Sequence, residues 1–181
     1  MDFTEKTISK DLIMKGKVLT VERHRVTLPN GKESLREVVK HPGAVAIIAI
    51  KDDKILLVEQ YRKALEDTLI EIPAGKVEAG EDRRNTALRE LEEETGYTSK
   101  EMELINEFYV SPGFCNEFIS LFKAGDLIES NNLVADDDEF VEKHWLSFDE
   151  ADQWIKEGKI IDAKTIIAIQ SLMINIQNSR L

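Results

Sequence analysis

The residues best suited to chemistry are four glutamates in one ten-residue stretch, LRELEEETGY, from Leu88 to Tyr97. The stretch reads as the end of a helix, because Gly96 can take the left-handed conformation that terminates helices. A helix end carries partial negative charge, so each glutamate there costs about 0.3–1 kcal/mol, and Glu90 and Glu94 repel each other. A solvated acidic face is the simpler interpretation, but such a helix would place acidic residues early and basic residues late. The observed order favours a divalent cation, because Mg²⁺ binds carboxylate oxygens.

The helix must present these carboxylates beside a sheet. Placed at 100° per residue, it has an apolar arc for packing and a neighbouring arc of glutamates at the edge of the core. The apolar arc consists of Ala87, Leu88 and Leu91, and the acidic arc consists of Glu90, Glu93 and Glu94.

Strands and further helices follow from hydrophobic periodicity and turn residues. Residues 16–40 alternate in polarity around Asn30-Gly31, a strong hairpin signal. The sequence predicts buried strands at 43–50 and 54–61, further strands at 103–110, 115–123 and 141–146, and helices at 82–95, 148–158 and 163–177. Ser147 with Glu150 predicts a capping box, and Asp162 is expected to cap the last helix. This order is typical of an α+β fold, a mixed sheet sandwiched between helices.

Composition narrows the class of protein. The chain of 181 residues is 42% hydrophobic, enough for one domain with a small extra element. No apolar run reaches the roughly 18–20 residues of a membrane span, and no signal peptide is visible, so we expect a soluble, cytoplasmic protein. Three scattered histidines and the single Cys115 predict no zinc site and no disulfide. A net charge of −11 argues against nucleic acid as a partner.

The segment from Gly75 to Tyr97 resembles the Nudix box, G-x5-E-x7-R-E-U-x-E-E-x-G-U, in which U is bulky and apolar. The matching residues are Gly75, Glu81, Arg89, Glu90, Leu91, Glu93, Glu94 and Gly96, and the one departure is Tyr97 at an aliphatic position. The resemblance implies the Nudix fold, α/β/α with an N-terminal antiparallel β extension. It also implies Mg²⁺-dependent hydrolysis of a nucleoside diphosphate linked to another group, with Mn²⁺ as an alternative cation.

The same resemblance assigns roles within the box. Glu90 and Glu94 are implied as the principal metal ligands, with Glu93 as a ligand or as the group that activates water. Glu81 and the carbonyl oxygen of Ala74 complete the implied ligands. Arg89 would orient the carboxylates, and Gly75 would permit the loop geometry.

Outside the box, Pro112 stands fifteen residues after Tyr97, in SPGFCNE, as in the ADP-ribose pyrophosphatase subgroup. A simple turn would explain this proline equally well. The segment EQYR, ending at Arg62, makes the subgroup interpretation the stronger one. The residues implied at the substrate are Arg62, Pro112, Gly113, Phe114 and Glu117.

The acidic segment DDDEFVE resembles the loop in which subgroup members carry a catalytic or third-metal glutamate. Glu139 matches best and Asp137 second, with Glu93 as the alternative base. A solvated connection is the simpler interpretation. A base outside the helix is chemically convenient, because metal-bound carboxylates are poor proton acceptors.

Residues 1–40 resemble the extension with which subgroup members form homodimers, and residues 41–181 the Nudix hydrolase domain. Arg36 would then complete the substrate pocket of the second subunit; a private hairpin flap is the alternative. The implied reaction is ADP-ribose plus water to AMP plus ribose 5-phosphate. The alternatives are a broader nucleoside-diphosphate-sugar pyrophosphatase and a non-hydrolytic ADP-ribose sensor.

Overall fold

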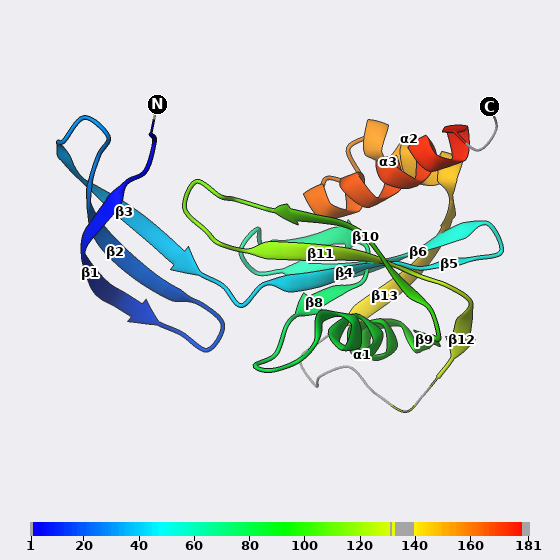
Figure 1. Ribbon diagram of the computed structural model, residues 1–181. Helices are drawn as coiled ribbons and strands as arrows, with labels where there is room; N and C mark the ends of the chain where they lie inside the picture. The colour runs from blue at the N-terminus through cyan, green and yellow to red at the C-terminus, as the bar shows by residue number, and fades with distance from the viewer. Residues whose placement is uncertain (1, 131, 133–139, 179–181) are drawn as a thin grey trace. The chain divides into compact units, whose positions relative to one another are not determined.

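The computed structural model describes residues 2–130, 132 and 140–178 (Figure 1). The chain divides into two compact units, Met1–Gly43 with Phe108–Ile119, and Ala44–Glu107 with Ser120–Leu181. The strands are β1 Lys6–Lys15, β2 Thr20–Thr27, β3 Glu33–Lys40, β4 Ala44–Ile48, β5 Ile50–Lys51, β6 Lys54–Arg62, β7 Asp67–Glu71, β8 Ala74–Lys76, β9 Tyr97–Ser99, β10 Met102–Tyr109, β11 Phe118–Ala124, β12 Leu127–Glu129 and β13 Val141–Ser147. The helices are α1 Arg83–Thr95, α2 Phe148–Lys156 and α3 Ala163–Asn178.

The first unit is built on an antiparallel sheet of order β1-β2-β3. The turn between β2 and β3 closes with Gly31 at φ 82°, a left-handed conformation that glycine adopts without strain, so the hairpin predicted at Asn30-Gly31 is confirmed. The segment 108–119 attaches to the end of β3. The backbone N–H of Val39 donates to the carbonyl of Phe114 (2.8 Å), and that of Asn116 donates to the carbonyl of Val39 (3.2 Å).

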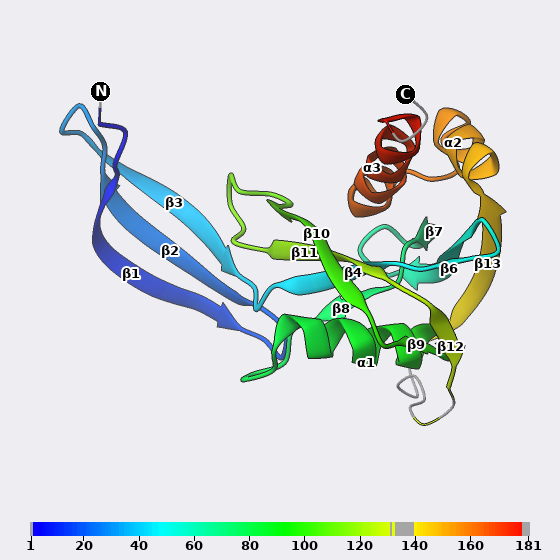
Figure 2. The same cartoon turned by 45° about the vertical axis from the view of Figure 1, so that its right-hand side comes forward.

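The second unit carries the main sheets, of order β10-β11-β4-β8 and β13-β6-β5, with β7 paired to β6 and a small β12-β9 pair. Strand β4 is buried along its whole length, which explains the continuous apolar run in the sequence. Within the unit, α1 lies on one side of the sheets, and α2 and α3 lie on the other (Figures 1 and 2). The predicted α/β/α arrangement is therefore confirmed.

Helix α1 packs against β4, β8 and β9, and α2 packs against α3, β13 and β6. The core under α1 joins residues of the helix to residues of both large sheets. Its buried members are Val45, Ile47, Ala49, Leu56, Ala87, Leu91, Met102, Phe122 and Ala124. Ser147 and Glu150 form the predicted capping box, and Asp162 accepts from the backbone N–H of Thr165 (3.0 Å).

The short strands β7, β8, β9 and β12 were not predicted, and the strand predicted at 43–50 ends at Ile48, with Ile50 in β5. Two further features also differ from the sequence prediction. Strand β1 lies within the β extension predicted for residues 1–40, but its bounds were not predicted, because nearly all of its residues are exposed and no buried face leaves an alternating pattern. Strand β11 begins at Phe118 rather than at residue 115, because the preceding residues bond to Val39 instead. Within the described residues, no helix combines the length and apolar character needed to cross a bilayer.

Candidate active site

Helix α1 is fixed at both ends. Asp82 accepts hydrogen bonds from the backbone N–H groups of Arg84 (2.9 Å) and Asn85 (3.3 Å), and Gly96 ends the helix at φ 72°. The last turn contains no basic residue of its own. Instead, Lys143 on β13 donates from Nζ to the carbonyl oxygen of Thr95 (3.0 Å). A neighbouring strand thus supplies positive charge where the glutamate-rich helix end lacks it.

Arg89 draws three glutamates of the box together. It donates from Nε and Nη2 to both carboxylate oxygens of Glu81 (3.1 and 3.0 Å), and from Nη1 to Glu93 (2.8 Å). The same Nη1 lies 2.9 Å from Oε1 of Glu90. The hydrogen bond from Arg89 lowers the pKa of Glu81, and the hydrogen bond to Glu81 raises the pKa of Arg89. Arg89 therefore contacts Glu81, Glu90 and Glu93 at once.

Gly75 and Glu90 approach each other so closely that only glycine fits. A Cβ added at Gly75 would lie 1.8 Å from Cδ of Glu90 and about as near both of its carboxylate oxygens. Glu90 and Glu94, one turn apart on α1, are both 8% exposed. Ala74, next to Gly75, donates its backbone N–H to Oε2 of Glu94 (3.0 Å). Gly75 lies in strand β8 and not in a loop, so its part is to leave room for the carboxylate of Glu90. Two largely buried carboxylates beside this strand fit a hard divalent cation, because burying like charges is costly without one.

Arg62, at the end of β6, is held by a carboxylate that the sequence analysis did not single out. It donates from Nε and Nη2 to the two oxygens of Glu71 (2.6 and 2.8 Å), which is only 2% exposed. Lys164, near the start of α3, donates to the same carboxylate and to Asp162. Hydrogen bonding to Glu71 raises the pKa of Arg62, and attraction to Glu94 adds to it. Arg62 thus lies within electrostatic reach of the box.

The remaining predicted substrate residues belong to the first unit. Arg36 forks onto Glu5, with Nε 2.9 Å and Nη2 2.5 Å from its carboxylate oxygens. Glu117 pairs with His41 at 3.8 Å. Phe114 is 57% exposed, in the same segment as Pro112 and Gly113. The box, Arg62 and Glu71 belong to the second unit.

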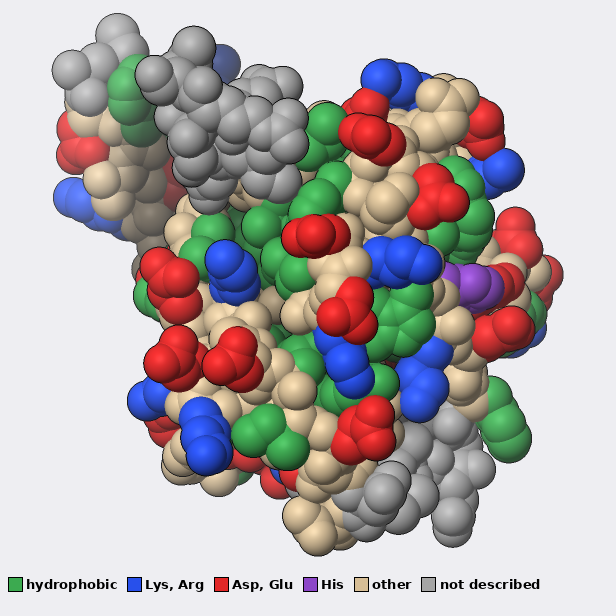
Figure 3. All heavy atoms as spheres, turned by 90° about the vertical axis from the view of Figure 1, so that its right-hand side faces the viewer, with side chains coloured by type: hydrophobic (Ala, Val, Ile, Leu, Met, Phe, Trp, Pro, Cys, Tyr) green, Lys and Arg blue, Asp and Glu red, His purple; other side chains and the backbone are tan. Residues whose placement is uncertain are grey.

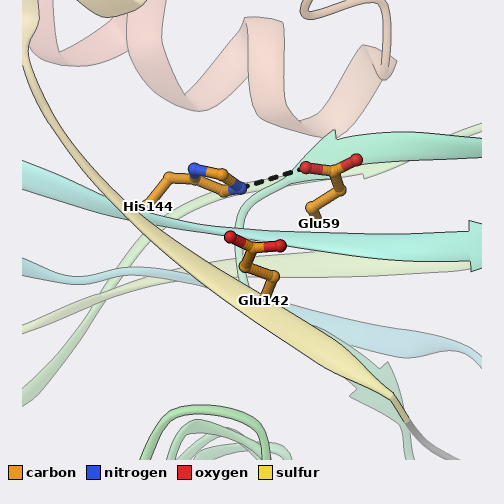
Figure 4. Close-up of side chains that lie close together, drawn as sticks. All are labelled: Glu59, Glu142 and His144. Carbon is orange, nitrogen blue, oxygen red and sulfur yellow. Dashed lines mark hydrogen bonds and ion pairs between the residues drawn. The ribbon is translucent and has the colours of Figure 1, made fainter.

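Glu139 and Asp137 lie outside the described residues. The sequence analysis missed two clusters of charged side chains. The first is Glu71 with Arg62 and Lys164. Its only sign in the sequence is that Glu71 is a single charged residue directly after apolar residues of a strand. The other cluster is Glu59, Glu142 and His144 (Figure 4), whose members are distant in the sequence.

Acidic and basic side chains are mixed on the face of the molecule drawn in Figure 3. On the face drawn in Figure 3, the described Lys and Arg side chains are interspersed with Asp and Glu rather than gathered in one basic patch. This distribution agrees with the acidic net charge of −11.

Two family models match the chain. The NUDIX domain matches residues 40–168, and the nucleoside diphosphate sugar hydrolase N-terminal domain matches residues 5–39. A solved structure titled "Crystal structure of ADP compounds hydrolase" superposes with a TM-score of 0.86, at 19% identity, covering 97% of this chain and 95% of that one. This likeness confirms the fold.

Curated relatives match over nearly the whole chain. The methanol dehydrogenase activator of Bacillus methanolicus is 53% identical over 95% of this chain and 94% of its own length. The ADP-ribose pyrophosphatase of Bacillus subtilis (strain 168) is 50% identical over 94% of this chain and 93% of its own length. The ADP-ribose pyrophosphatase of Mycobacterium tuberculosis is 34% identical over 91% of this chain and 81% of its own length. With a family model across most of its length and the box assembled on α1, the chain belongs to the Nudix hydrolase family.

Proposed function

We propose that the protein is an ADP-ribose pyrophosphatase that converts ADP-ribose and water to AMP and ribose 5-phosphate in the cytoplasm. The observation that carries the proposal is the assembled box on α1, where Arg89 gathers Glu81, Glu90 and Glu93 beside Gly75. Relatives at 50% and 34% identity bear the name of this activity. The geometry supports metal-assisted attack on a diphosphate, and the relatives' names supply the substrate.

The proposed cation is Mg²⁺, with Mn²⁺ as the alternative. When bound, it would neutralise the pyrophosphate and lower the pKa of a bound water. Glu90 and Glu94 are the proposed principal ligands, with Glu81, Glu93 and the carbonyl oxygen of Ala74 completing the set. Arg89 already holds Glu81 and Glu93, so its role is to keep these carboxylates oriented.

The chemistry breaks one P–O bond of the pyrophosphate while water adds to that phosphorus. Glu139 is the proposed proton acceptor, with Asp137 second and Glu93 as the alternative within the box. Replacing Glu139 by Gln should lower kcat by about 10²–10⁴-fold with little change in KM, the usual range for a positioned base. Near-normal kcat in that variant, together with a large loss in Asp137→Asn, would move the role to Asp137.

Arg62 is the proposed substrate contact in the second unit, because its side chain is 39% exposed although Glu71 binds it. The segment with Pro112, Gly113 and Phe114 is proposed to cover the terminal ribose, and Glu117 to contact the substrate. These roles rest on the resemblance and on the exposure of Phe114.

We further propose that residues 1–40 serve a homodimer, with Arg36 contributing to the partner's pocket and residues 41–181 forming the hydrolase domain. Support comes from apolar side chains that the β1–β3 unit leaves exposed. They are Phe3, Ile8, Leu12, Ile13, Met14, Val18 and Leu35. A second copy of this chain would cover such a surface.

A second candidate function is suggested by the relative named methanol dehydrogenase activator, at 53% identity. Adding the protein to a methanol dehydrogenase and following alcohol oxidation tests this candidate directly. Stimulation that survives loss of hydrolysis would indicate an action independent of the box.

The decisive experiment measures kcat/KM for ADP-ribose, other nucleoside diphosphate sugars, dGTP and diadenosine polyphosphates, with Mg²⁺ and with EDTA. We expect ADP-ribose to be preferred and EDTA to abolish turnover. A higher kcat/KM for dGTP would contradict the proposal, and equal values for several diphosphate sugars would indicate the broader pyrophosphatase. Ligand-induced melting shifts without hydrolysis would indicate a sensor.

Glu94→Gln supplies the matched variant for this assay. It removes one charge but keeps the shape of the side chain, so kcat should fall by at least about 10²-fold while the fold is kept. Glu150→Gln changes a glutamate that caps α2 and is the control for the general effect of the substitution. Unchanged turnover of Glu94→Gln at limiting Mg²⁺ would refute the assignment of this ligand.

A further inference from the structure

We propose that Glu59, Glu142 and His144 form a second cation site, separate from the box, that takes a first-row transition ion such as Zn²⁺. Among the residues that the structure describes, this is the one set of three His, Cys, Asp or Glu side chains whose ligand atoms all lie within 4.8 Å of one another (Figure 4).

The pairing of β6 with β13 builds the set. Glu142 stands directly opposite Glu59 in the antiparallel register, and His144 stands opposite Leu57. Side chains of a strand alternate between the two faces, so all three groups share one face. Lys143 points to the other face, where it reaches Thr95 at the end of α1. The His144 ring instead meets Trp154 of α2, with ring centroids 6.2 Å apart. The set therefore lies on the side of the sheet away from α1.

The charges are arranged as a cation would require. Like charges directly opposite each other on neighbouring strands destabilise a sheet, and Glu59 and Glu142 are such a pair. His144 gives one of the two carboxylates a hydrogen-bond partner, since its Nε2 lies 3.1 Å from Oε2 of Glu59. Within the described part of the chain, no hydrogen bond or ion pair engages the exposed carboxylate of Glu142. A divalent ion between the three groups would compensate both carboxylates at once.

The spacing is close to that of a bound ion. Metal bonds of about 2.0–2.2 Å place neighbouring ligand atoms about 3–4 Å apart. His144 and Glu59 already have this spacing. Glu142 is exposed, so a rotation about its side-chain torsions can bring its oxygen to the same distance. His144 and Glu59 are partly sheltered, at 23% and 32% exposure, and leave a further position open to water.

The ligand types select the ion. An imidazole with two carboxylates suits Zn²⁺ and its first-row neighbours, whereas Mg²⁺ prefers an all-oxygen octahedron that retains several waters. The box offers only oxygen ligands. The two sites should therefore divide the ions between them, Mg²⁺ at the box and Zn²⁺ at Glu59, Glu142 and His144. An ion here would link two strands whose ligands are 85 residues apart in the chain, and so stabilise the sheet that carries Arg62.

The test is equilibrium dialysis of Zn²⁺ in excess Mg²⁺. The double variant Glu90→Gln/Glu94→Gln removes the principal box ligands, and this protein should still bind one Zn²⁺ per chain. Adding His144→Gln or Glu142→Gln should weaken that binding by more than about tenfold. The control is His24→Gln, which alters a His–Glu pair of 2.7 Å on β2 and should leave Zn²⁺ binding unchanged. The wild-type chain saturated with Mg²⁺ gives the same comparison if the box variant folds poorly.

A second measurement reads the ligand itself. Zn²⁺ should shift the imidazole ¹⁵N resonance of His144 and leave that of His24 in place. The proposal is overturned if the box variant binds no Zn²⁺, if binding survives His144→Gln or Glu142→Gln, or if only His24→Gln abolishes it. None of these outcomes bears on the hydrolysis of ADP-ribose, which is measured separately with the intact box.

Discussion

At the scale of single residues, two arginines hold carboxylates in different ways. Arg89 shares its guanidinium among Glu81, Glu90 and Glu93, so that acidic groups at a helix end can stay close together. Arg62 instead forms an ion pair with one carboxylate, that of Glu71, which is almost fully buried. The first arrangement keeps the proposed metal ligands in place. The second fixes a proposed substrate contact to the start of α3 through Lys164.

Glu71→Gln should destabilise the protein strongly. It removes the carboxylate that compensates both Arg62 and Lys164, and removal of one partner from a buried pair costs about 3 kcal/mol or more. Part of Arg62 is exposed, so the lower end of that range applies. Chemical denaturation of both proteins measures the difference. Glu66→Gln breaks the exposed pair with Lys63 and should cost less than about 0.5 kcal/mol. Equal losses from the two variants would show that the burial of Glu71 does not matter.

The same residue sets a pH dependence. Burial raises the pKa of Glu71, but the hydrogen bonds from Arg62 and Lys164 outweigh it and hold the pKa below its ordinary value of 4.5. A carboxyl with a lowered pKa in the folded state contributes stability above pH 4.5, and this contribution is lost as the pH falls through the folded-state value. The free energy of unfolding of the wild-type chain should fall below pH 4.5. The free energy of unfolding of Glu71→Gln should fall less steeply below pH 4.5. If its pH dependence were parallel to that of the wild-type chain, this prediction would be wrong.

Gly75→Ala tests the close approach to Glu90. The added Cβ would overlap the carboxylate, so Glu90 must move away from the other ligands. We expect kcat to fall and the Mg²⁺ requirement to rise by about 10–100-fold, as when the support of a metal ligand is lost. The melting temperature should change little, because the end of a side chain can move. Normal Mg²⁺ dependence in this variant would place the cation elsewhere.

Some residues of the candidate sites could be predicted from the sequence and others could not. Arg89, Glu90, Glu93 and Glu94 were predicted together because they lie on one helix, where spacing fixes geometry, whereas Gly75 and Glu81, which lie outside α1, came from the resemblance to the Nudix box. Glu71, Lys164, Glu59 and His144 were not predicted, because strand register and helix docking bring them together. The three histidines are too scattered in the sequence to predict a zinc site, and only the pairing of β13 with β6 brings His144 close to Glu59 and Glu142.

At the scale of elements, α1 is a helix whose last turn is compensated by a neighbouring strand. Lys143→Met keeps most of the side-chain volume and removes the charge at the Thr95 carbonyl. The metal-free protein should lose about 0.5–1 kcal/mol, the usual value of a cation at a helix C-terminus. Thermal unfolding in EDTA measures this. Lys63→Met removes an exposed cation that pairs with Glu66 in a turn, away from any helix end, and is the comparison, with a smaller expected loss.

At the scale of the whole molecule, the β1–β3 unit exposes apolar side chains that a homodimer would cover. Leu12, on β1, is 62% exposed. Leu12→Arg should give a monomer in size-exclusion chromatography with light scattering, because a charge would be buried without a partner in the interface. Ile161→Arg introduces the same charge at a site that is 61% exposed in the second unit, and should leave the assembly unchanged. A monomeric wild-type chain, or a dimer in both variants, would rule out this interface.

The layered architecture followed from the sequence, because buried strands and capped helices each leave a local signal. The bounds of strand β1 did not, since nearly all of its residues are exposed and no buried face leaves an alternating pattern. The segment before β11 did not either, because Val39 in a distant part of the chain competes for its backbone groups.

The two tryptophans of the chain stand at different sites. Trp145 packs edge-on against Tyr97, the residue that follows Gly96 at the end of the box helix, with ring centroids 5.7 Å apart. Trp154 packs against His144. The protein therefore carries two tryptophan fluorophores, one packed on the residue that follows the box helix and one packed on His144. In Trp154→Phe, the emission of Trp145 should change when Mg²⁺ binds at the box. In Trp145→Phe, the emission of Trp154 should change when Zn²⁺ binds at His144. Tryptophan fluorescence can therefore report the occupancy of each site separately.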